Sequence, residues 1–288
     1  MAQRDFLLWL LMIPGLGIKG RYRIWIYLKE NKLSKLSWQQ ILTISKIRQS
    51  QRNEATYWFK ETNWQVEWHK LQYQTYIAIC DAAYPITLSE CIDAPICLFY
   101  KGDLSLLVQP LVAIVGSRQA TTYGISVLKS WIPGLIAAGL TTVSGLAAGI
   151  DELTHRETLK ANGQTIAIIG TGFDYAYPKH CEDLQNMISQ LGLVLSEYLP
   201  WQGPKRHHFP ERNRIISGLC QVCLVIEAKK RSGSLITAML ALEQNRTVMA
   251  LPGRIDGQYS VGTNELILAG ATPVLSVDQI VLEFANFY

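Results

Sequence analysis

Short apolar runs alternate with segments of helical periodicity from residue 111 to the end of the chain. The run over residues 222–226 is almost wholly apolar, which is typical of a strand buried on both faces of a parallel sheet. Because strand and helix alternate, the pattern predicts right-handed crossovers, and hence an α/β fold with a doubly wound, mainly parallel sheet. The expected strands are 112–115, 141–143, 165–169, 193–195, 222–226, 248–251 and 273–275, and the expected helices include 121–138, 148–161 and 179–190.

The first 72 residues show helical periodicity instead. Pro14-Gly15-Leu16-Gly17 separates two helical segments and resembles a helix-hairpin-helix turn, whose glycines let backbone amides approach a phosphate closely. The same motif also serves as a packing or protein-docking element, and we favour such a role over DNA contact here. We therefore expect a small all-α domain over residues 1–72 and an α/β domain over residues 73–288, with bridging strands in 73–110.

Charge is distributed unevenly along the chain. Residues 1–75 hold 12 Lys and Arg against five Asp and Glu, whereas the whole chain has a net charge of only +4. Six of the eight Trp also lie before residue 70. A basic, aromatic-rich head favours a polyanionic partner, although a solvated basic face explains the charge nearly as well.

The six cysteines follow neither a disulfide framework nor a zinc-ligand spacing. We interpret them as small buried apolar side chains in a reducing compartment. No apolar segment is long enough for a membrane span, and the apolar run 6–13 directly follows Asp5 and has no cleavage site after it. The sequence therefore predicts a cytoplasmic protein with no membrane partner, no metal and no cofactor.

Gly, Ser and Thr follow five of the predicted strands. The carboxyl ends of parallel strands meet at one edge of a sheet, where ligands bind, so we expect these loops to converge on a phosphate-lined groove. A set of ordinary turns is the alternative. The loops are Gly116-Ser117-Arg118, Ser144-Gly145, Gly170-Thr171-Gly172, Ser232-Gly233-Ser234 and Pro252-Gly253-Arg254.

The loop Ser232-Gly233-Ser234 is the clearest candidate anion site among them. It connects a buried strand to the start of a helix, where unpaired backbone N–H groups and the helix dipole both favour a negative charge. Arg212 and Arg214, in the preceding helix, supply guanidinium groups that favour phosphate. An ordinary strand-to-helix crossover with a polar turn fits this loop equally well.

Fingerprints of nucleotide-dependent enzymes fit poorly. The G-x-G-x-x-G pattern is incomplete after Gly170-x-Gly172, and a Walker lysine is missing. Asp151 and His155 lie four residues apart on one helix face and could polarise a nucleophile, but we favour a buried hydrogen-bonding role that fixes two segments. Without a nucleophile elbow, paired carboxylates or a metal cluster, the sequence predicts a binding protein and not an enzyme.

Several ordered motifs carry a family resemblance. They span about residues 76–275 and together resemble the DNA processing protein A (DprA/Smf) family. The helical head fits too, since members often carry a sterile-alpha-motif-like or helix-hairpin-helix domain there. The motifs include Val112-Ala113-Ile114-Val115-Gly116-Ser117-Arg118, Ser144-Gly145-Leu146-Ala147-x-Gly149-Ile150-Asp151, Tyr177-Pro178, Phe209-Pro210-x-Arg212-Asn213-Arg214 and Ser232-Gly233-Ser234-Leu235-Ile236-Thr237-Ala238.

The resemblance implies an extended Rossmann fold that binds single-stranded DNA and loads the RecA recombinase onto it. In naturally transformable bacteria such proteins protect the incoming strand. The resemblance also implies a homodimer formed through the Rossmann domain, and no catalytic activity. Many members carry a C-terminal winged helix, which we do not expect here because the sequence ends at Tyr288, directly after its last predicted helix.

The resemblance also suggests which residues contact phosphates. Matched by motif, these are Arg118, Lys179, Arg206, Asn213 and Arg214. The sequence departs from the family pattern at His180-Cys181, where members commonly have an Asn near the helix start. With the loops included, the predicted DNA-binding residues are Gly116, Ser117, Arg118, Ser144, Gly145, Gly170, Gly172, Lys179, Arg206, Asn213, Arg214, Ser232, Gly233 and Ser234.

Two other functions fit parts of the sequence. Rossmann-like enzymes of the lysine-decarboxylase-like group hydrolyse nucleoside monophosphates and use similar phosphate-binding loops. Their P-G-G-x-G-T-x-x-E motif is matched poorly, because no acidic residue follows Thr237 before Glu243. A scaffold that only docks recombination partners is the third hypothesis.

Overall fold

The structure is a computed structural model that describes residues 2–285 and residue 287. It divides into two compact units. One comprises the chain up to Tyr100 together with Glu197–Leu199, and the other comprises Lys101–Ser196 and Pro200 onward. The first unit therefore contains the helical head and most of the strand residues expected within 73–110. The domain boundary at residue 72 stays a prediction.

The first unit is mainly helical and has an aromatic core. The ring of Trp9 lies 5.7 Å from that of Trp64 and 6.1 Å from that of Trp58, and Trp38 stacks on Phe59 at 4.3 Å. The clustered tryptophans of the head therefore contribute to packing. The elements are α1 (Gln3–Leu10), α2 (Ile18–Glu30), α3 (Trp38–Ile44), α4 (Gln49–Glu61), α5 (Trp64–Leu71), α6 (Ile86–Ser89) and the antiparallel strands β1 (Tyr76–Ala78) and β2 (Cys97–Gly102).

The Pro-Gly-x-Gly turn lies between α1 and α2. Gly15 has a φ of +73°, and a Cβ at this position would lie 2.8 Å from the Cβ of Gln51 in α4. Arg21 and Arg23, which flank the turn, donate hydrogen bonds to the carbonyls of Leu11 and Ser45. Gly15 is thus packed against α4, whereas Gly17 is exposed, and the role of the turn stays a prediction.

The second unit contains a parallel sheet with the strand order β6-β5-β4-β3-β7-β8-β9. Val112 of β3 lies opposite Val222 of β7, and the whole of both strands is buried. The predicted doubly wound α/β fold is confirmed. The strands are β3 (Leu111–Val115), β4 (Thr141–Ser144), β5 (Thr165–Ile169), β6 (Leu193–Ser196), β7 (Val222–Val225), β8 (Thr247–Ala250) and β9 (Thr272–Pro273).

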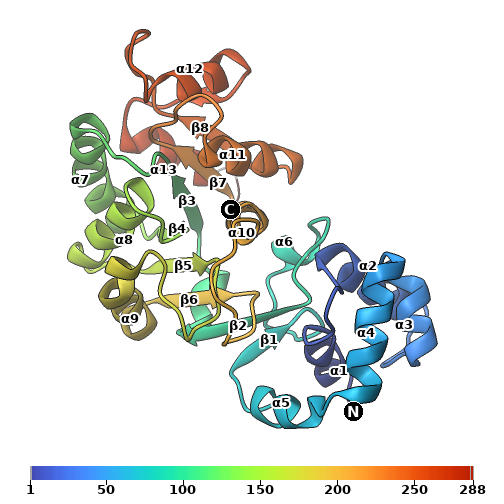
Figure 1. Ribbon diagram of the computed structural model, residues 1–288. Helices are drawn as coiled ribbons and strands as arrows, with labels where there is room; N and C mark the ends of the chain where they lie inside the picture. Colours follow the sequence, from blue (N-terminus) through green and yellow to red (C-terminus); the bar gives the residue numbers. More distant parts are fainter. Residues whose placement is uncertain (1, 286, 288) are drawn as a thin grey trace. The chain divides into compact units, whose positions relative to one another are not determined.

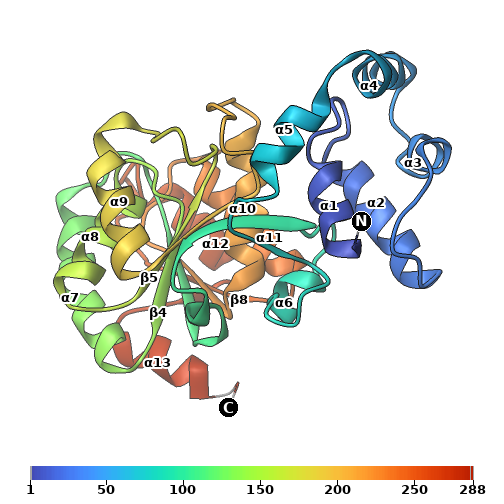
Figure 2. The ribbon, with the colours of Figure 1, turned by 90° about the horizontal axis from the view of Figure 1, so that it is seen from below.

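Helices cover both faces of this sheet, with α7, α8, α9 and α13 on one face and α10, α11 and α12 on the other (Figures 1 and 2). Leu128 and Ile132 of α7 pack with Ile280 and Phe284 of α13 against the apolar side chains of β3 and β7. The helices are α7 (Thr122–Ala137), α8 (Ile150–Lys160), α9 (Glu182–Leu191), α10 (His208–Leu219), α11 (Gly233–Glu243), α12 (Val261–Leu268) and α13 (Val277–Ala285), and short 3₁₀ helices cover Leu104–Val108 and Lys179–Cys181.

Two further predictions concern cysteines and membranes. All six cysteines are free thiols, and all but the half-buried Cys80 are buried, as expected for small apolar side chains. None of the helices in the described part of the chain is both long and apolar enough to cross a bilayer.

Candidate functional site

An open cavity of about 610 Å³ lies at the carboxyl edge of the sheet in the second unit. Its walls are the loops that follow β3 and β7, together with the first half of α10. In the sheet, β3 lies between β4, which follows it in the chain, and β7, which comes later in the chain. The cavity therefore occupies the topological switch point, where open α/β sheets bind their ligands.

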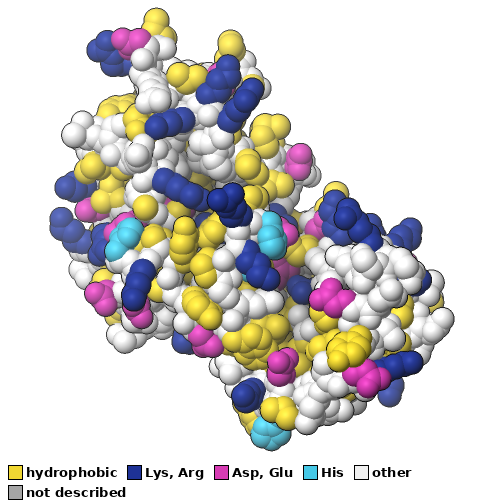
Figure 3. Space-filling model, viewed as in Figure 1, with side chains coloured by type: hydrophobic (Ala, Val, Ile, Leu, Met, Phe, Trp, Pro, Cys, Tyr) yellow, Lys and Arg dark blue, Asp and Glu magenta, His cyan; other side chains and the backbone are white. Residues whose placement is uncertain are grey.

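Positive side chains outnumber negative ones in the lining of this cavity. Arg118 comes from the loop after β3, and Lys229, Lys230 and Arg231 come from the loop after β7. The ammonium group of Lys229 donates a hydrogen bond to Oε1 of Gln119 at 3.1 Å. Lys and Arg side chains gather over the region of α10 and α11 on the face drawn in Figure 3. This concentration of cations favours an anionic ligand.

The start of α11 adds backbone donors to the cavity. Ser232 is the N-cap residue of this helix, but its side chain does not cap the first-turn amides. Its hydroxyl lies 2.7 Å from the hydroxyl of Ser234 instead. Gly233 faces open space, with no atom within 4 Å of where a Cβ would lie. An uncapped helix N-terminus that faces an open cavity can bind a phosphate through its N–H groups and its dipole.

Two buried residues of opposite charge, Arg212 and Asp151, line the cavity. Arg212 of α10 is 4% exposed, and its Nη1 donates to the carbonyl of Ile168 at 2.9 Å. Asp151 accepts hydrogen bonds from the backbone of Gly145 and Ala147. Burial raises the pKa of Asp151, and the positive charge of Arg212 opposes this shift. Arg212 thus partly neutralises the carboxylate nearest to the anion site.

Comparison with known proteins is consistent with a site of this kind. The family model described as DNA recombination-mediator protein A matches residues 75–285. The DNA processing protein DprA of Streptococcus pneumoniae is 50% identical over 207 residues, which cover 72% of this chain and 73% of that protein. The chain belongs to the DprA family.

Solved structures of DprA proteins share the fold. The crystal structure of the S. pneumoniae protein has a TM-score of 0.89 at 41% identity and covers 97% of both chains. DNA processing protein A of Helicobacter pylori, whose structure addresses a single-stranded DNA binding mode, has a TM-score of 0.67 at 29% identity. It covers 75% of this chain and 98% of its own.

The cavity of this DprA-family chain brings together half of the residues predicted from the sequence. They come from the loop after β3, from α10 and from the loop before α11. Their roles in DNA binding remain predictions. They are Gly116, Ser117, Arg118, Asn213, Ser232, Gly233 and Ser234.

The other predicted residues do not line the cavity. The loops after β5 and β8 are absent from its walls, so three of the five expected loops contribute, the one after β4 only through Ala147. Arg214 is 8% exposed within α10, whereas Lys179 and Arg206 are exposed on the surface outside the cavity. The residues outside the cavity are Ser144, Gly145, Gly170, Gly172, Lys179, Arg206 and Arg214.

Close packing explains why several of the predicted glycines are not at the cavity surface. A Cβ on Gly145 would lie 1.5 Å from Nη1 of Arg212, and one on Gly170 would lie 3.0 Å from the ring of Phe209. The amide of Gly172 donates to the carbonyl of Gln202 at 2.7 Å. Even Gly116, which lines the cavity, packs against Ile150. These glycines allow segments to approach one another. A Cβ on Gly233, in contrast, would lie in open space.

Sequence reasoning missed some of the strongest candidates. Phe209 belongs to the quoted F-P-x-R-N-R motif but was not named as a contact, and Arg212 was named beside the Ser232-Gly233-Ser234 loop but left out of the predicted DNA-binding residues. Three cations directly precede the predicted Ser232-Gly233-Ser234 loop, namely Lys229, Lys230 and Arg231. Because they belong to the same turn as this loop, they lie beside the anion site. The run of three cations was the signal that could have found them.

Asp151 and His155 each fix a separate segment. Nδ1 of His155 lies 2.7 Å from Oγ1 of Thr165 in β5, while Asp151 is bound to the loop after β4. Burial is the main cause that lowers the pKa of His155 to about 3, and Arg212 adds to the shift. The pair has the structural role that the sequence favoured over a catalytic one.

Proposed function

We propose that this chain binds single-stranded DNA along the cavity between the loops after β3 and β7. The observation that carries the proposal is one cavity in which uncapped amides at the start of α11 lie beside Arg118, Lys229 and Arg231. A row of separate cations suits a chain of phosphates better than one small anion, because each cation neutralises a different charge. The single-strand binding reported for the H. pylori relative supports this choice of ligand.

The predicted contacts outside the cavity fit a longer path for the strand. Phe209 lies at the cavity wall, and its ring centre is 5.1 Å from that of Tyr177. Lys179 follows Tyr177 closely in the chain and is exposed, so the strand passes from Arg118 over this aromatic pair toward Lys179. Exposed aromatic rings beside cations provide stacking surfaces for bases.

The protein acts by binding and not by catalysis in this proposal. His155 is fully buried and does not line the cavity, and its pKa, lowered to about 3, makes it a weak base near neutral pH. The loop before α11 also lacks the acidic residue of the nucleotide-hydrolase motif. We expect no release of free base when the purified protein is incubated with nucleoside monophosphates.

The bound strand is then delivered to the RecA recombinase by a homodimer. Ile236, Met239 and Leu242 form an exposed apolar row on α11, which offers a protein contact surface beside the DNA site. RecA and incoming DNA meet in the cytoplasm, where we place this protein. Light scattering should give the mass of a dimer, and the protein should accelerate RecA assembly on strands coated with single-strand-binding protein.

Fluorescence anisotropy with a labelled oligonucleotide tests the main step. We expect the single strand to bind more tightly than a duplex of the same sequence, because a confined cavity admits one strand. Equal affinity for the two forms would contradict the proposal. A protein that binds the strand but leaves RecA assembly unchanged would contradict the delivery step alone.

A further inference from the structure

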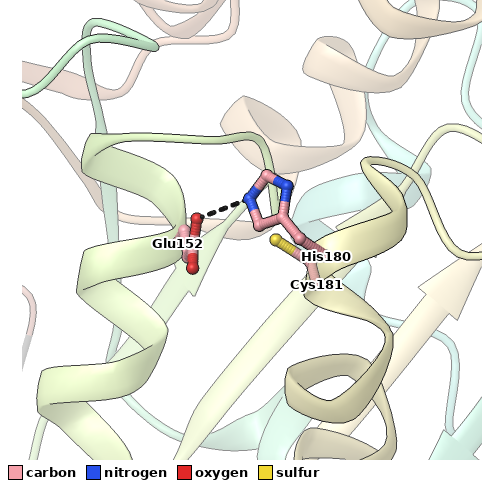
Figure 4. A group of neighbouring side chains, drawn as sticks. All are labelled: Glu152, His180 and Cys181. Atoms are coloured by element: carbon pink, nitrogen blue, oxygen red, sulfur yellow. Dashed lines mark hydrogen bonds and ion pairs between the residues drawn. The ribbon is translucent and has the colours of Figure 1, made fainter.

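Three side chains with metal-ligating atoms meet where α8 faces the 3₁₀ helix Lys179–Cys181. A carboxylate oxygen of Glu152, a ring nitrogen of His180 and the sulfur of Cys181 all lie within 4.8 Å of one another (Figure 4). No other group of three His, Cys, Asp or Glu ligands this close occurs among residues 2–285 and 287. These residues do not line the cavity. We propose that Glu152, His180 and Cys181 bind a zinc-class transition-metal ion.

The spacing of the ligand atoms is close to what a tetrahedral ion requires. Nε2 of His180 lies 3.1 Å from Oε2 of Glu152, and the sulfur of Cys181 lies within 4.8 Å of both ligand atoms. A tetrahedral Zn²⁺ with bonds of about 2.0–2.1 Å holds two N or O ligands roughly 3.4 Å apart. The ion would therefore replace the hydrogen bonds at the carboxylate, with a small outward movement of each side chain.

The chemical nature of the ligands selects the class of metal. A thiolate, an imidazole and a carboxylate suit Zn²⁺ and related transition metals, whereas Mg²⁺ and Ca²⁺ prefer ligands that are all oxygen. Three protein ligands leave one position of a tetrahedron for water. The side chain of His180 is 59% exposed, which gives the ion a route from solvent.

Arg156 completes the surroundings of the site. Its Nε donates to Oε1 of Glu152 at 2.9 Å, which holds the carboxylate in place and leaves Oε2 for the ion. Hydrogen bonds of this kind orient ligands in metal sites. The charges also match, since a carboxylate and a thiolate together neutralise a divalent ion and leave the Arg156 cation beside a neutral centre.

Metal binding must deprotonate the thiol of Cys181. Cys181 is buried beside the Glu152 carboxylate, and a cysteine binds a metal ion as its thiolate. Binding forms a sulfur–metal bond and releases the thiol proton to solvent, as at other cysteine-ligated sites. The site fixes the 3₁₀ helix to α8, and Lys179, a predicted DNA contact, is the first residue of that 3₁₀ helix.

Cobalt(II) titration of the full-length, metal-free protein tests the site. Co²⁺ gives visible bands in tetrahedral coordination and a charge-transfer band when a thiolate is bound. We expect both bands to saturate at stoichiometric cobalt and to disappear when Zn²⁺ is added in excess. Absence of the thiolate band from the wild-type protein would overturn the proposal.

Matched variants locate the ligands. Cys181→Ser should abolish the charge-transfer band, whereas Cys80→Ser, at the half-buried thiol outside the cluster, should retain it. His180→Ala should weaken Zn²⁺ binding by about 100-fold or more, since loss of even an outer partner of a metal site costs about 10- to 100-fold. His69→Ala, a control at an exposed histidine, should bind like the wild type.

Comparing His180→Ala with the wild type tests the metal site even if Cys181→Ser fails to fold, because the exposed imidazole of His180 contributes little to the core. Excess Zn²⁺ should raise the melting temperature of the wild type and of His69→Ala but not that of His180→Ala. Equal Zn²⁺ affinity in His180→Ala and the wild type would show that the cluster is only an ion pair with a neighbouring thiol.

Discussion

The guanidinium carbon of Arg118 lies 5.9 Å from the centre of the Phe209 ring. Arg118 belongs to the loop after β3 and Phe209 to α10, so this contact joins two walls of the cavity. A cation over an aromatic face gains about 0.5–1 kcal/mol at an exposed site. The ring therefore holds Arg118 in the position from which we expect it to contact a phosphate.

Replacing this ring should weaken DNA binding without removing a charge. Phe209→Leu keeps an apolar side chain over Gly170 but removes the face on which Arg118 rests, and we expect single-strand affinity to fall by about 0.5–1 kcal/mol. Anisotropy titration measures the loss, and urea denaturation shows whether the fold is retained. Wild-type affinity in a folded variant would mean that Phe209 does not position Arg118.

Two glycines of the predicted site should respond in opposite ways to the same added methyl group. Gly145→Ala places a Cβ 1.5 Å from Nη1 of the buried Arg212, whereas Gly233→Ala places one in open space. Overpacking typically costs about 1–3 kcal/mol, so Gly145→Ala should lose at least that much free energy of unfolding, and Gly233→Ala almost none. Urea denaturation of the two variants compares them directly, and equal stability would contradict the packing role of Gly145.

Buried histidines should make the fold sensitive to acid. His155 is fully buried with a pKa of about 3, against 6.5 for the free side chain. Between these values the unfolded chain takes up a proton that the folded chain excludes, so stability falls as the pH drops from 6.5 toward 3. The slope is up to about 1.4 kcal/mol per pH unit. His208, whose pKa burial lowers to about 4, adds a similar contribution.

The variant His155→Gln isolates the share of His155 in this effect. The amide can still form a hydrogen bond with Thr165 but does not titrate. Urea denaturation between pH 4 and 6 should give a slope for the variant that is shallower by up to about 1.4 kcal/mol per pH unit. His69→Gln, at an exposed position, should leave the slope unchanged. A slope for His155→Gln equal to that of the wild type would show that His155 is not held neutral in the fold.

The layout of the α/β unit could be predicted from the sequence because its signals are local. Buried parallel strands such as 222–226 are apolar almost throughout, and the helices between them carry a clear period. The structure differs mainly at helix boundaries. The helix expected over 179–190 begins at Glu182, since Lys179–Cys181 form a 3₁₀ helix first.

The site was less predictable because side-chain direction and long-range packing are not local. Gly145 and Gly170 have the composition of a phosphate loop, but Arg212 and Phe209 from α10 pack against them. Arg214 was expected to line the groove but does not line the cavity, since residues two apart on a helix, such as Arg212 and Arg214, lie on different faces. A pattern of residue types predicts that loops meet at one edge, but not which of them a later helix covers.

The most direct test of the proposed DNA site is the salt dependence of single-strand binding by Arg118→Ala. Lys129→Ala, which removes an exposed cation from α7 outside the cavity, is the matched control. We expect Arg118→Ala to lose about 1–3 kcal/mol of affinity, and the slope of log affinity against log salt to decrease by about 0.7, the contribution of a single phosphate contact. Lys129→Ala should match the wild type in both quantities. Wild-type affinity and slope in Arg118→Ala would contradict the assignment of this cavity to the DNA strand.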